Sequence, residues 1–467
     1  MNEHGLELAL GKMKAAGLTD AAMSGFARAW RQAASGEAGL MPEAGLEPAA
    51  GIPALDDVAS GGEDPRLPDK LCVIKLNGGL GTGMGLEKAK SLIPVKGGLT
   101  FLDFIARQIL RQRQEHGTRG PRFLLMDSFS TSADTLAYLA RYPELSADGR
   151  LDFVQSKVPK LEAKTFAPVE WPADPGLEWC PPGHGDIYPA LLGSGWLDLL
   201  AGEGVEYLFV SNSDNLGATA DLRVLDYFAR SGLSFLMEVA ERTASDRKGG
   251  HLARRRADGR FVLREVAQCP PADQDFFQDI SLHRYFNTNN LWIRVSDLRE
   301  ALSEHGGSLP LPLIKNTKTV DPRDPASPKV LQLEGAMGAA IECFAKAGAL
   351  LVPRTRFAPV KTTGDLLALR SDAYAVTPDE RLELVPERRG IPPEVVLDDA
   401  HYKLLAGLEA AFGGGAPSLR ACDRIEVRGS WKFREGVVCE GSVKFLNAGE
   451  RPSAANAGVF SDVVVEA

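Results

Sequence analysis

Residues 75–94 read K-L-N-G-G-L-G-T-G-M-G-L-E-K-A-K-S-L-I-P and place five glycines directly after a short apolar run that begins at Leu71. The apolar run predicts a strand that is buried on both faces of a sheet. Glycines let the backbone approach a ligand closely and adopt positive φ values, so that successive N–H groups point at anionic oxygens. The stretch therefore predicts a phosphate-binding loop in an α/β fold, with a flexible glycine turn as the alternative.

The loop matches neither of the two commonest phosphate-binding motifs. It contains no G-x-x-x-x-G-K-[S/T] run, and its glycine spacing never satisfies G-x-G-x-x-G. These absences disfavour a P-loop ATPase and a dinucleotide-binding dehydrogenase.

Composition narrows the class of protein further. The 467 residues suffice for two or three domains, and the 44% of hydrophobic residues suffices for a substantial core. The net charge of -9 gives no support to nucleic-acid binding, so an anion site has to be a local feature. The six cysteines form no Cys-x-x-Cys pair, which disfavours a zinc site or a disulfide framework. No signal-peptide pattern or membrane-length apolar stretch is present, and we expect a cytoplasmic protein.

Three regions follow from changes in the sequence pattern. Residues 1–69 predict a helical N-terminal extension and an irregular connector rich in Gly and Pro. Residues 70–372 alternate short apolar runs with helical patterns, which predicts a Rossmann-like, mostly parallel sheet covered by helices on both faces. We expect strands at 123–126, 153–154, 207–210, 235–239 and 291–295, and helices at 101–113, 135–141, 190–200, 222–230 and 336–347. Residues 373–467 predict a small β domain, in which glycines about six residues apart favour a short β-helix or a β-meander equally.

Five motifs in chain order carry a resemblance to a known family. They are the glycine loop with K-S-L-I-P-V beyond it, P-P-G-H-G-D (181–186), S-N-S-D-N-L-G-A (211–218), F-N-T-N-N-L-W (286–292) and P-V-K-T-T-G-D-L (359–366). In these motifs the chain resembles the eukaryotic-type UTP:glucose-1-phosphate uridylyltransferases, also called UDP-glucose pyrophosphorylases. The resemblance is strong over residues 71–369. It implies a nucleotidyltransferase fold and a left-handed β-helix at the C-terminus.

The reaction of this family joins two anions, because a sugar phosphate attacks the α-phosphorus of UTP and pyrophosphate leaves. Such a reaction needs in-line alignment, N–H groups, lysines and Mg²⁺ rather than a side-chain nucleophile. The resemblance implies that Lys90 and Lys361 are catalytic. Asp214 follows an apolar strand and is the candidate ligand of Mg²⁺, which usually takes one or two protein carboxylates. An Asx-turn is the alternative role for Asp214.

The resemblance divides the remaining candidates into two groups. The nucleotide-binding group is Leu76, Asn77, Gly78, Gly79, Gly81, Thr82, Gln155 and Gly183, with Gln155 and Gly183 at the uracil. The sugar-phosphate group is His184, Asn212, Asn289, Asn290 and Lys248. Structural roles remain open for several of them: a core histidine at position 184, a capped turn at 286–290, and an exposed hairpin or a mobile lid at 242–260.

We therefore expect an enzyme that converts UTP and glucose 1-phosphate into UDP-glucose and pyrophosphate with Mg²⁺. The alternatives are a broader UDP-sugar or UDP-N-acetylhexosamine pyrophosphorylase and a non-catalytic protein that binds a nucleotide sugar. The sequence leaves open a homo-oligomer formed through the C-terminal domain, and it indicates neither a nucleic acid nor a membrane as a partner.

Overall fold

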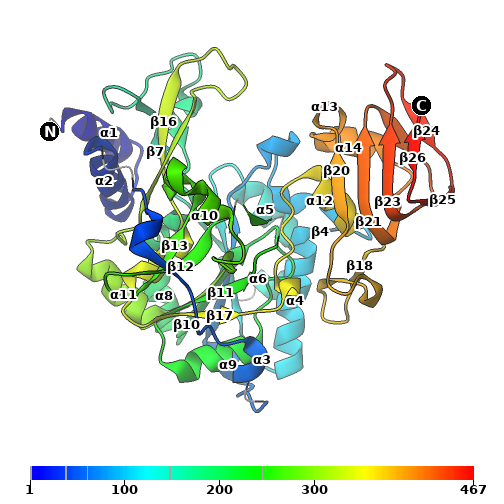
Figure 1. Ribbon diagram of the computed structural model, residues 1–467. Coiled ribbons are helices and arrows are strands. Elements are labelled where there is room, and N and C mark those ends of the chain that lie inside the picture. The colour runs from blue at the N-terminus through cyan, green and yellow to red at the C-terminus, as the bar shows by residue number, and fades with distance from the viewer. Residues whose placement is uncertain (1–2, 37–38, 60, 147–148, 244–245, 248) are drawn as a thin grey trace.

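A large central sheet separates two smaller parts of the molecule. The computed structural model describes residues 3–36, 39–59, 61–146, 149–243, 246–247 and 249–467. The N-terminal helices α1 (His4–Ala15) and α2 (Asp20–Ala34) lie at one side of the sheet, and the C-terminal β domain lies at the opposite side (Figure 1).

Ten strands form the central sheet. They are β1 (Leu46–Pro48), β2 (Leu71–Asn77), β5 (Arg122–Asp127), β6 (Asp152–Val154), β10 (Tyr207–Asn212), β11 (Phe235–Glu241), β12 (His251–Arg255), β13 (Phe261–Arg264), β14 (Tyr285–Arg294) and β17 (Ala347–Leu351). Strands β10, β2, β5 and β6 are parallel neighbours in that order, and β17 runs parallel to β11. Strand β14 lies antiparallel between β10 and β11, while β12 pairs with β1, β13 and the start of β14. The sheet is therefore mixed rather than mostly parallel as predicted: among the described strands, only the β10-β2-β5-β6 part and the β11–β17 pair are parallel. The strand expected at 291–295 is the C-terminal part of the antiparallel β14, which ends at Arg294.

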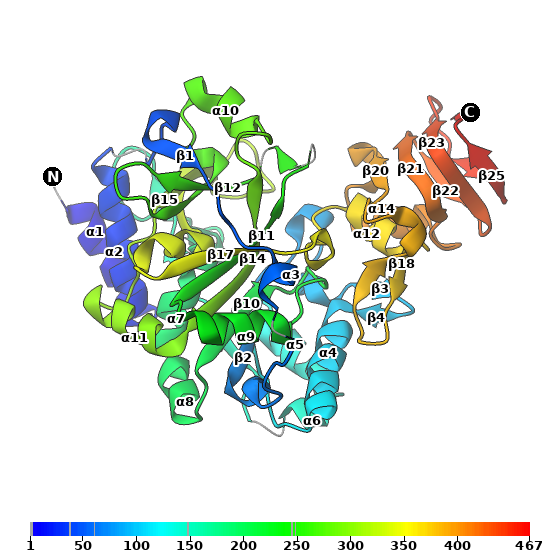
Figure 2. The same cartoon turned by 60° about the horizontal axis from the view of Figure 1, so that its bottom comes forward.

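Both faces of the sheet are covered by helices, as the sequence predicts (Figure 2). Alternate residues of each strand enter opposite cores, so that Val73 packs on one side and Ile74 on the other. The first face packs against α4 (Phe101–His116), α9 (Leu222–Ser231) and α12 (Thr363–Arg370). The second face packs against α7 (Ile187–Gly193), α8 (Trp196–Gly202) and α11 (Val295–Glu304).

Two of the predicted helices differ from the structure: one is divided into two helices, and the other is a 3₁₀ segment. The helix expected at 190–200 is divided into α7 and α8 at Gly195, which has a φ of +77°. Residues 336–347 are not an α-helix, because the 3₁₀ segment η10 (Met337–Cys343) leads directly into β17. A Cβ at Gly338 would lie 2.6 Å from the Asn287 amide and 2.8 Å from Leu263. This close tertiary packing accompanies the 3₁₀ geometry, which local helix propensity does not predict.

The N-terminal helices pack on a group of short strands beside the sheet, which are β7 (Val158–Pro159), β8 (Leu161–Glu162), β9 (Trp179–Cys180), β15 (Leu313–Thr319) and β16 (Lys329–Gly335). Trp30 is buried there and donates its indole N–H to the Phe166 carbonyl at 2.9 Å. The connector is more regular than predicted, because β1 pairs with β12 and α3 (Leu55–Val58) follows it. Leu46 and Leu55 are buried, so hydrophobic burial fixes a segment whose composition resembles a loop.

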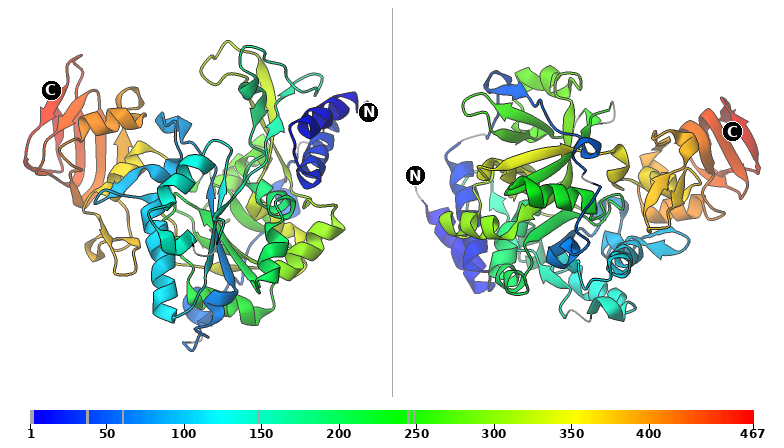
Figure 3. Two further views of the ribbon diagram at one scale, coloured as in Figure 1. Left: turned by 180° about the vertical axis from the view of Figure 1, so that it is seen from behind. Right: turned by 90° about the horizontal axis from the view of Figure 1, so that it is seen from below.

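The C-terminal domain consists of stacked parallel strands (Figure 3). They are β20 (Glu394–Leu397), β21 (Ser418–Arg428), β22 (Trp431–Phe433), β23 (Val437–Leu446), β24 (Ser453–Ala455), β25 (Gly458–Ser461) and β26 (Val464–Glu466). Strand β21 pairs in parallel with β20 and β23, and β23 pairs in parallel with β25 and β26. This pairing excludes the antiparallel meander.

Smaller elements complete the fold. The helices are α5 (Ser132–Leu139), α6 (Pro143–Ser146), α10 (Gln274–Gln278), α13 (Asp399–Tyr402) and α14 (Leu405–Ala411), and the strands are β3 (Pro94–Lys96), β4 (Leu99–Thr100), β18 (Tyr374–Val376) and β19 (Leu382–Leu384). No helix in the described part of the chain has both the length and the apolar character needed to span a membrane.

A buried ion pair connects the sheet to the segment that follows β17. The Arg356 guanidinium donates to both carboxylate oxygens of Glu238 on β11, at 2.8 and 2.6 Å. The indole N–H of Trp292 donates to the same carboxylate at 2.9 Å, so each oxygen of Glu238 accepts at least two hydrogen bonds with the Asn290 amide included. Only 0% and 5% of the Glu238 and Arg356 side chains are exposed, and removal of either partner would leave a buried charge unpaired.

We predict that Glu238→Gln lowers the free energy of unfolding by about 3–5 kcal/mol, because the Arg356 charge loses its partner inside the core. Urea denaturation followed by fluorescence measures this change. The matched control is Glu241→Gln on the same strand, whose carboxylate pairs with Arg284 at an exposed position. That variant should lose less than about 1 kcal/mol. Equal losses in the two variants would contradict the role given to the buried pair.

Candidate active site

The glycine loop lies at the carboxyl end of β2, where ligands bind in open α/β sheets. Gly81 and Gly85 have φ values of +65° and +74°, which side chains disfavour. The loop closes on itself because the Lys90 N–H donates to the Gly79 carbonyl at 3.1 Å. The exposed Gly79 and half-buried Gly78 leave their backbone accessible, and the closed loop places Lys90 beside them.

Lys90 contacts two segments that are distant in the sequence. Its ammonium group lies 2.7 Å from the Asp214 carboxylate and also donates to the Val360 carbonyl. The Lys90 and Asp214 side chains are 17% and 20% exposed, so the pair is mostly buried but still accessible to a ligand. The predicted catalytic lysine and the predicted metal ligand are therefore direct partners.

Residues 353–361 form a strap that crosses from β17 to Asp214. Asn215 forms a bridge with Pro359, and the Val360 N–H donates to the Asp214 carbonyl at 3.2 Å. Lys361 follows immediately, with an exposed side chain and its backbone N–H bonded to Asp365 at 2.8 Å. The strap thus brings both predicted catalytic lysines to the same edge of the sheet.

Gln155 and Gly183, the two residues expected at the uracil, each pack closely against another segment. A Cβ at Gly78 would lie 2.7 Å from the Gln155 amide nitrogen, so the Gln155 side chain packs directly on the glycine loop. The Gln155 N–H donates to the Asp127 carbonyl at 2.7 Å, which fixes its backbone to β5. Gly183 has a φ of +80°, and a Cβ there would lie 2.6 Å from the Gly335 carbonyl oxygen. The P-P-G-H-G-D segment therefore lies against β16 at a position that only glycine fits.

His184 has a defined tautomer. Its Nδ1 accepts a hydrogen bond from the Met337 backbone N–H at 2.9 Å, so Nδ1 is unprotonated and Nε2 carries the proton. Burial lowers the pKa of His184 to about 4, which keeps the ring neutral near pH 7. The ring therefore offers one N–H donor, suited to a phosphate or hydroxyl oxygen, and no positive charge.

The candidate amides differ in how far they are already bonded. Asn77 is buried and donates to Asp127 and Thr135 at 2.7 and 3.1 Å, so its side-chain N–H groups bond to residues inside the protein. Asn290 is also buried and donates to Glu238 at 2.9 Å. Asn289 is half-buried at a φ of +59° and is bonded to Asn287, and Asn212 is half-buried at the end of β10. Among these four amides, only Asn212 and Asn289 are not fully buried.

Two candidates are not described in full. Lys248 lies outside the described residues, and so does the side chain of Thr82. Leu76 is half-buried at the end of β2, where its carbonyl accepts from the Ser213 N–H at 3.1 Å, so it ties β2 to the loop that contains Asp214.

Asp214 fits the requirements of a Mg²⁺ ligand. Its Oδ2 pairs with Lys90, whereas its Oδ1 is buried without a hydrogen-bond partner. Such an oxygen is costly unless a ligand meets it. No group of three or more His, Cys, Asp or Glu side chains that could hold a metal ion occurs among the residues described in the structure. A cation here would combine Asp214 with substrate phosphates, as Mg²⁺ commonly does.

Glu265 is a residue of this region that sequence reasoning missed. A Cβ at Gly250 would lie 2.6 Å from its carboxylate, so the carboxylate packs on the glycine pair that follows position 248. Burial raises the pKa of Glu265, and the positive charge of Lys361 opposes that rise. The sequence offered no signal for Glu265, because an acidic residue after a short strand is common.

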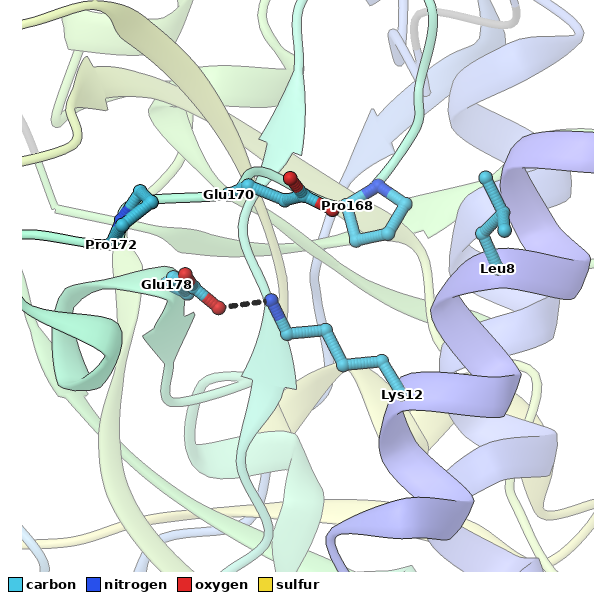
Figure 4. Close-up of a pocket in the computed structure, with 6 residues that line it drawn as sticks. All are labelled: Leu8, Lys12, Pro168, Glu170, Pro172 and Glu178. Atoms are coloured by element: carbon cyan, nitrogen blue, oxygen red, sulfur yellow. Dashed lines mark hydrogen bonds and ion pairs between the residues drawn. The ribbon is translucent and has the colours of Figure 1, made fainter.

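A surface pocket lies away from these candidates. It has a volume of about 490 Å³ and is lined by Leu8, Lys12, Pro168, Glu170, Pro172 and Glu178 (Figure 4). Inside it the Lys12 ammonium binds the Glu178 carboxylate and ties α1 to the segment around β9. None of the lining residues is a candidate from the sequence, and the ion pair gives the pocket a structural role.

Known proteins resemble this chain over most of its length. The sequence profile of the family described as UTP--glucose-1-phosphate uridylyltransferase matches residues 46–440. The enzyme of that name from Solanum tuberosum is 40% identical over 83% of this chain and 80% of its own length. The Saccharomyces cerevisiae enzyme is 39% identical over 85% of this chain and 78% of its own length.

Solved structures resemble the fold equally closely. A UDP-glucose phosphorylase from Trypanosoma brucei is 48% identical, with a TM-score of 0.92 over 99% of each chain. A variant of UDP-glucose pyrophosphorylase from Leishmania major, solved in complex with UDP-glucose, is 47% identical, with a TM-score of 0.93 over 99% of each chain.

We predict that Gly183→Ala weakens UTP binding at least about tenfold, because the new methyl group would collide with the Gly335 carbonyl and move the loop. Calorimetric titration measures the affinity. Gly195→Ala is the control: it has a similar φ of +77° but no atom within 4 Å of the added methyl group, and it lies between α7 and α8. Unchanged affinity in Gly183→Ala would show that the loop does not contact the nucleotide.

We further predict that His184 titrates near pH 4, because burial disfavours its charged form. The unfolded chain takes up this proton near pH 6.5, so the stability contributed by neutral His184 is complete above that pH and is lost as the pH falls toward 4. Imidazole NMR signals, assigned by comparison with His184→Gln, measure the midpoint. A midpoint near 6.5 would contradict the buried, neutral ring.

Proposed function

The chain belongs to the UTP--glucose-1-phosphate uridylyltransferase family, and on this premise we propose that it transfers the uridylyl group of UTP to glucose 1-phosphate. A phosphate oxygen of glucose 1-phosphate forms a bond to the α-phosphorus of UTP. The bond from that phosphorus to the β-phosphate oxygen breaks, and UDP-glucose and pyrophosphate result. The reaction is reversible and needs no proton from the protein, because the attacking phosphate is already ionised.

The convergence of Lys90, Asp214 and the 353–361 strap is the observation that best supports this proposal. Three segments that are far apart in the sequence meet at the carboxyl end of β2, and each brings a charged group that two anionic substrates require. A protein that only binds a nucleotide sugar has no need of this arrangement. The hypothesis of an enzyme is therefore favoured over the hypothesis of a protein that only binds a nucleotide sugar.

In this mechanism the residues act by position and charge. Lys90 exchanges the Asp214 carboxylate for a phosphate oxygen as substrate enters, and Lys361 approaches the phosphates from the strap. Mg²⁺ held by Asp214 would neutralise phosphate charge and orient the oxygens for in-line attack. His184 donates its Nε2–H to a phosphate or sugar oxygen without adding charge. Gly78, Gln155 and Gly183 surround the base.

The sugar and the nucleotide then occupy separate parts of the site. Asn212, Asn289 and Glu265 supply amide and carboxylate groups for glucose hydroxyls on the side of β10 and β14, whereas the backbone of the exposed Gly79 and the half-buried Gly81 lies along the phosphates. Asn77 and Asn290 contribute through the backbone and through packing. We also propose that residues 70–372 are the catalytic unit, that 1–69 and 373–467 flank it, and that the C-terminal coils form a left-handed β-helix.

We predict that the protein releases pyrophosphate from UTP and glucose 1-phosphate, that EDTA abolishes this turnover, and that Lys90→Ala lowers kcat at least about 100-fold by removing a charge at the reacting phosphates. A coupled pyrophosphate assay with a panel of sugar 1-phosphates measures these effects. Lys88→Ala is the control, because Lys88 is an exposed lysine on the same loop.

Other outcomes discriminate between the alternatives. Faster turnover with another sugar 1-phosphate would overturn the substrate and keep the chemistry. Binding of UDP-glucose with no turnover for any sugar would favour a non-catalytic protein. An equal loss of activity in Lys88→Ala would show that the loop needs its total charge rather than Lys90 in particular.

A further inference from the structure

One buried amino group bonds to both ends of the segment that carries Asp214. Residues 211–218 leave β10, turn at Asp214 and return toward the sheet. The Lys75 ammonium donates to the Ser211 hydroxyl at 2.8 Å and to the Ala218 carbonyl at 2.5 Å. One side chain thus holds the first and the last residue of this loop together.

Lys75 is an unusual residue for the centre of a sheet. It lies on β2 directly opposite Ser211 on β10, only 2% exposed, with its ammonium 5.8 Å from the centre of the Phe209 ring. Burial, with the nearby Arg356 charge, lowers the pKa of Lys75 to about 7. An apolar residue would avoid this desolvation. The hydrogen bonds to the loop are what the amino group adds at this position.

Asp214 itself has few direct supports. Its backbone carbonyl accepts from the Val360 N–H, its Oδ2 contacts Lys90, and its Oδ1 has no partner. Lys90 is mobile in the proposed mechanism, because it moves to the phosphates. Once Lys90 has left it in that mechanism, the direction of the Asp214 carboxylate depends on the shape of the loop.

We propose that Lys75 is a positioning residue that fixes the 211–218 loop and thereby aims the Asp214 carboxylate at the cation. This inference rests on the proposed function for the identity of the reaction. Lys75 would not touch the cation but would orient the residue that binds it. Removal of such an orienting residue commonly lowers metal affinity about 10- to 100-fold.

The test compares Lys75→Met with the wild-type enzyme. Methionine has a similar length and cannot donate, so the loop loses both hydrogen bonds. We expect the Mg²⁺ concentration for half-maximal turnover to rise about tenfold or more and kcat to fall, with unchanged binding of UDP-glucose in EDTA. Hydrogen exchange of the peptide covering 212–218, in protein without ligand, should accelerate locally. Mn²⁺ binding in the presence of UTP, followed by EPR, should weaken in parallel.

A control and a milder variant separate positioning from stability. Lys160 is another buried lysine, which lies between β7 and β8 and whose ammonium donates to the carbonyl of Val320, the residue after β15, at 2.8 Å. Lys160→Met should lower the thermal midpoint without changing the Mg²⁺ dependence or exchange at 212–218. Ser211→Ala removes one of the two Lys75 bonds. The Ser211→Ala variant should raise the Mg²⁺ concentration for half-maximal turnover by a smaller factor than Lys75→Met. It replaces Lys75→Met as the test if that variant does not fold.

The outcomes distinguish this inference from the proposed function. If wild type shows no uridylyl transfer, the proposed function fails, while local exchange at 212–218 and Mn²⁺ binding still test the loop. If wild type is active and both Lys75→Met and Ser211→Ala keep the wild-type Mg²⁺ dependence and exchange rate, Lys75 is only a structural residue and the inference is wrong. Recovery of the wild-type Mg²⁺ dependence by adding Ser211→Ala to Lys75→Met would also overturn it.

Discussion

The buried pair of Glu238 and Arg356 is the interaction on which the arrangement of the site depends. Glu238 belongs to β11, which lies between β14 and β17, and Arg356 belongs to the 353–361 strap. The strap has little regular structure of its own, so its path requires a fixed point. Once Arg356 is bonded, its carbonyl accepts from Asn215 and Asn290, and the chain continues to Val360 and Lys361. The ion pair thus anchors the strap where it meets the segment around Asp214, and the backbone contacts of Asn215, Pro359 and Val360 complete the junction.

The pair belongs to a row of polar groups that crosses one face of the sheet near its carboxyl end. Lys75 on β2 and Ser211 on β10 are cross-strand neighbours, and Asn290 on β14 is bonded to Glu238 on β11. The rest of this face is packed with apolar side chains. Buried polar groups are costly unless they are bonded, and a bonded set fixes one geometry. The row therefore supports the loops directly above it, where phosphate chemistry needs accurate positions.

Some of this architecture could be predicted from the sequence, for physical reasons. The apolar run before Asn77 and the glycines after it contain local information about strand burial and loop conformation, so the sheet and the loop were predictable. The strap was not, because its position depends on Arg356 reaching Glu238 across 118 residues of chain. Asn290 shows the same limit: its amide N–H groups donate to Glu238 and to the Arg356 carbonyl, and these contacts with distant parts of the chain are not encoded in its motif. The 3₁₀ geometry after Ala336 also depends on tertiary packing rather than on local pattern.

The contact between Lys90 and Asp214 explains how a site for two anions remains stable without them. Several unpaired lysines close together would repel one another, and an unpaired carboxylate with a buried oxygen would be costly. Pairing the two removes most of both penalties, yet each charge keeps some access to solvent. Substrate phosphates can therefore replace the carboxylate at Lys90 by exchange of one anionic partner for another. The loop that bears Asp214 keeps its bonds to Lys75, Leu76 and Val360 during this exchange, so that Lys90 can move while Asp214 stays in place.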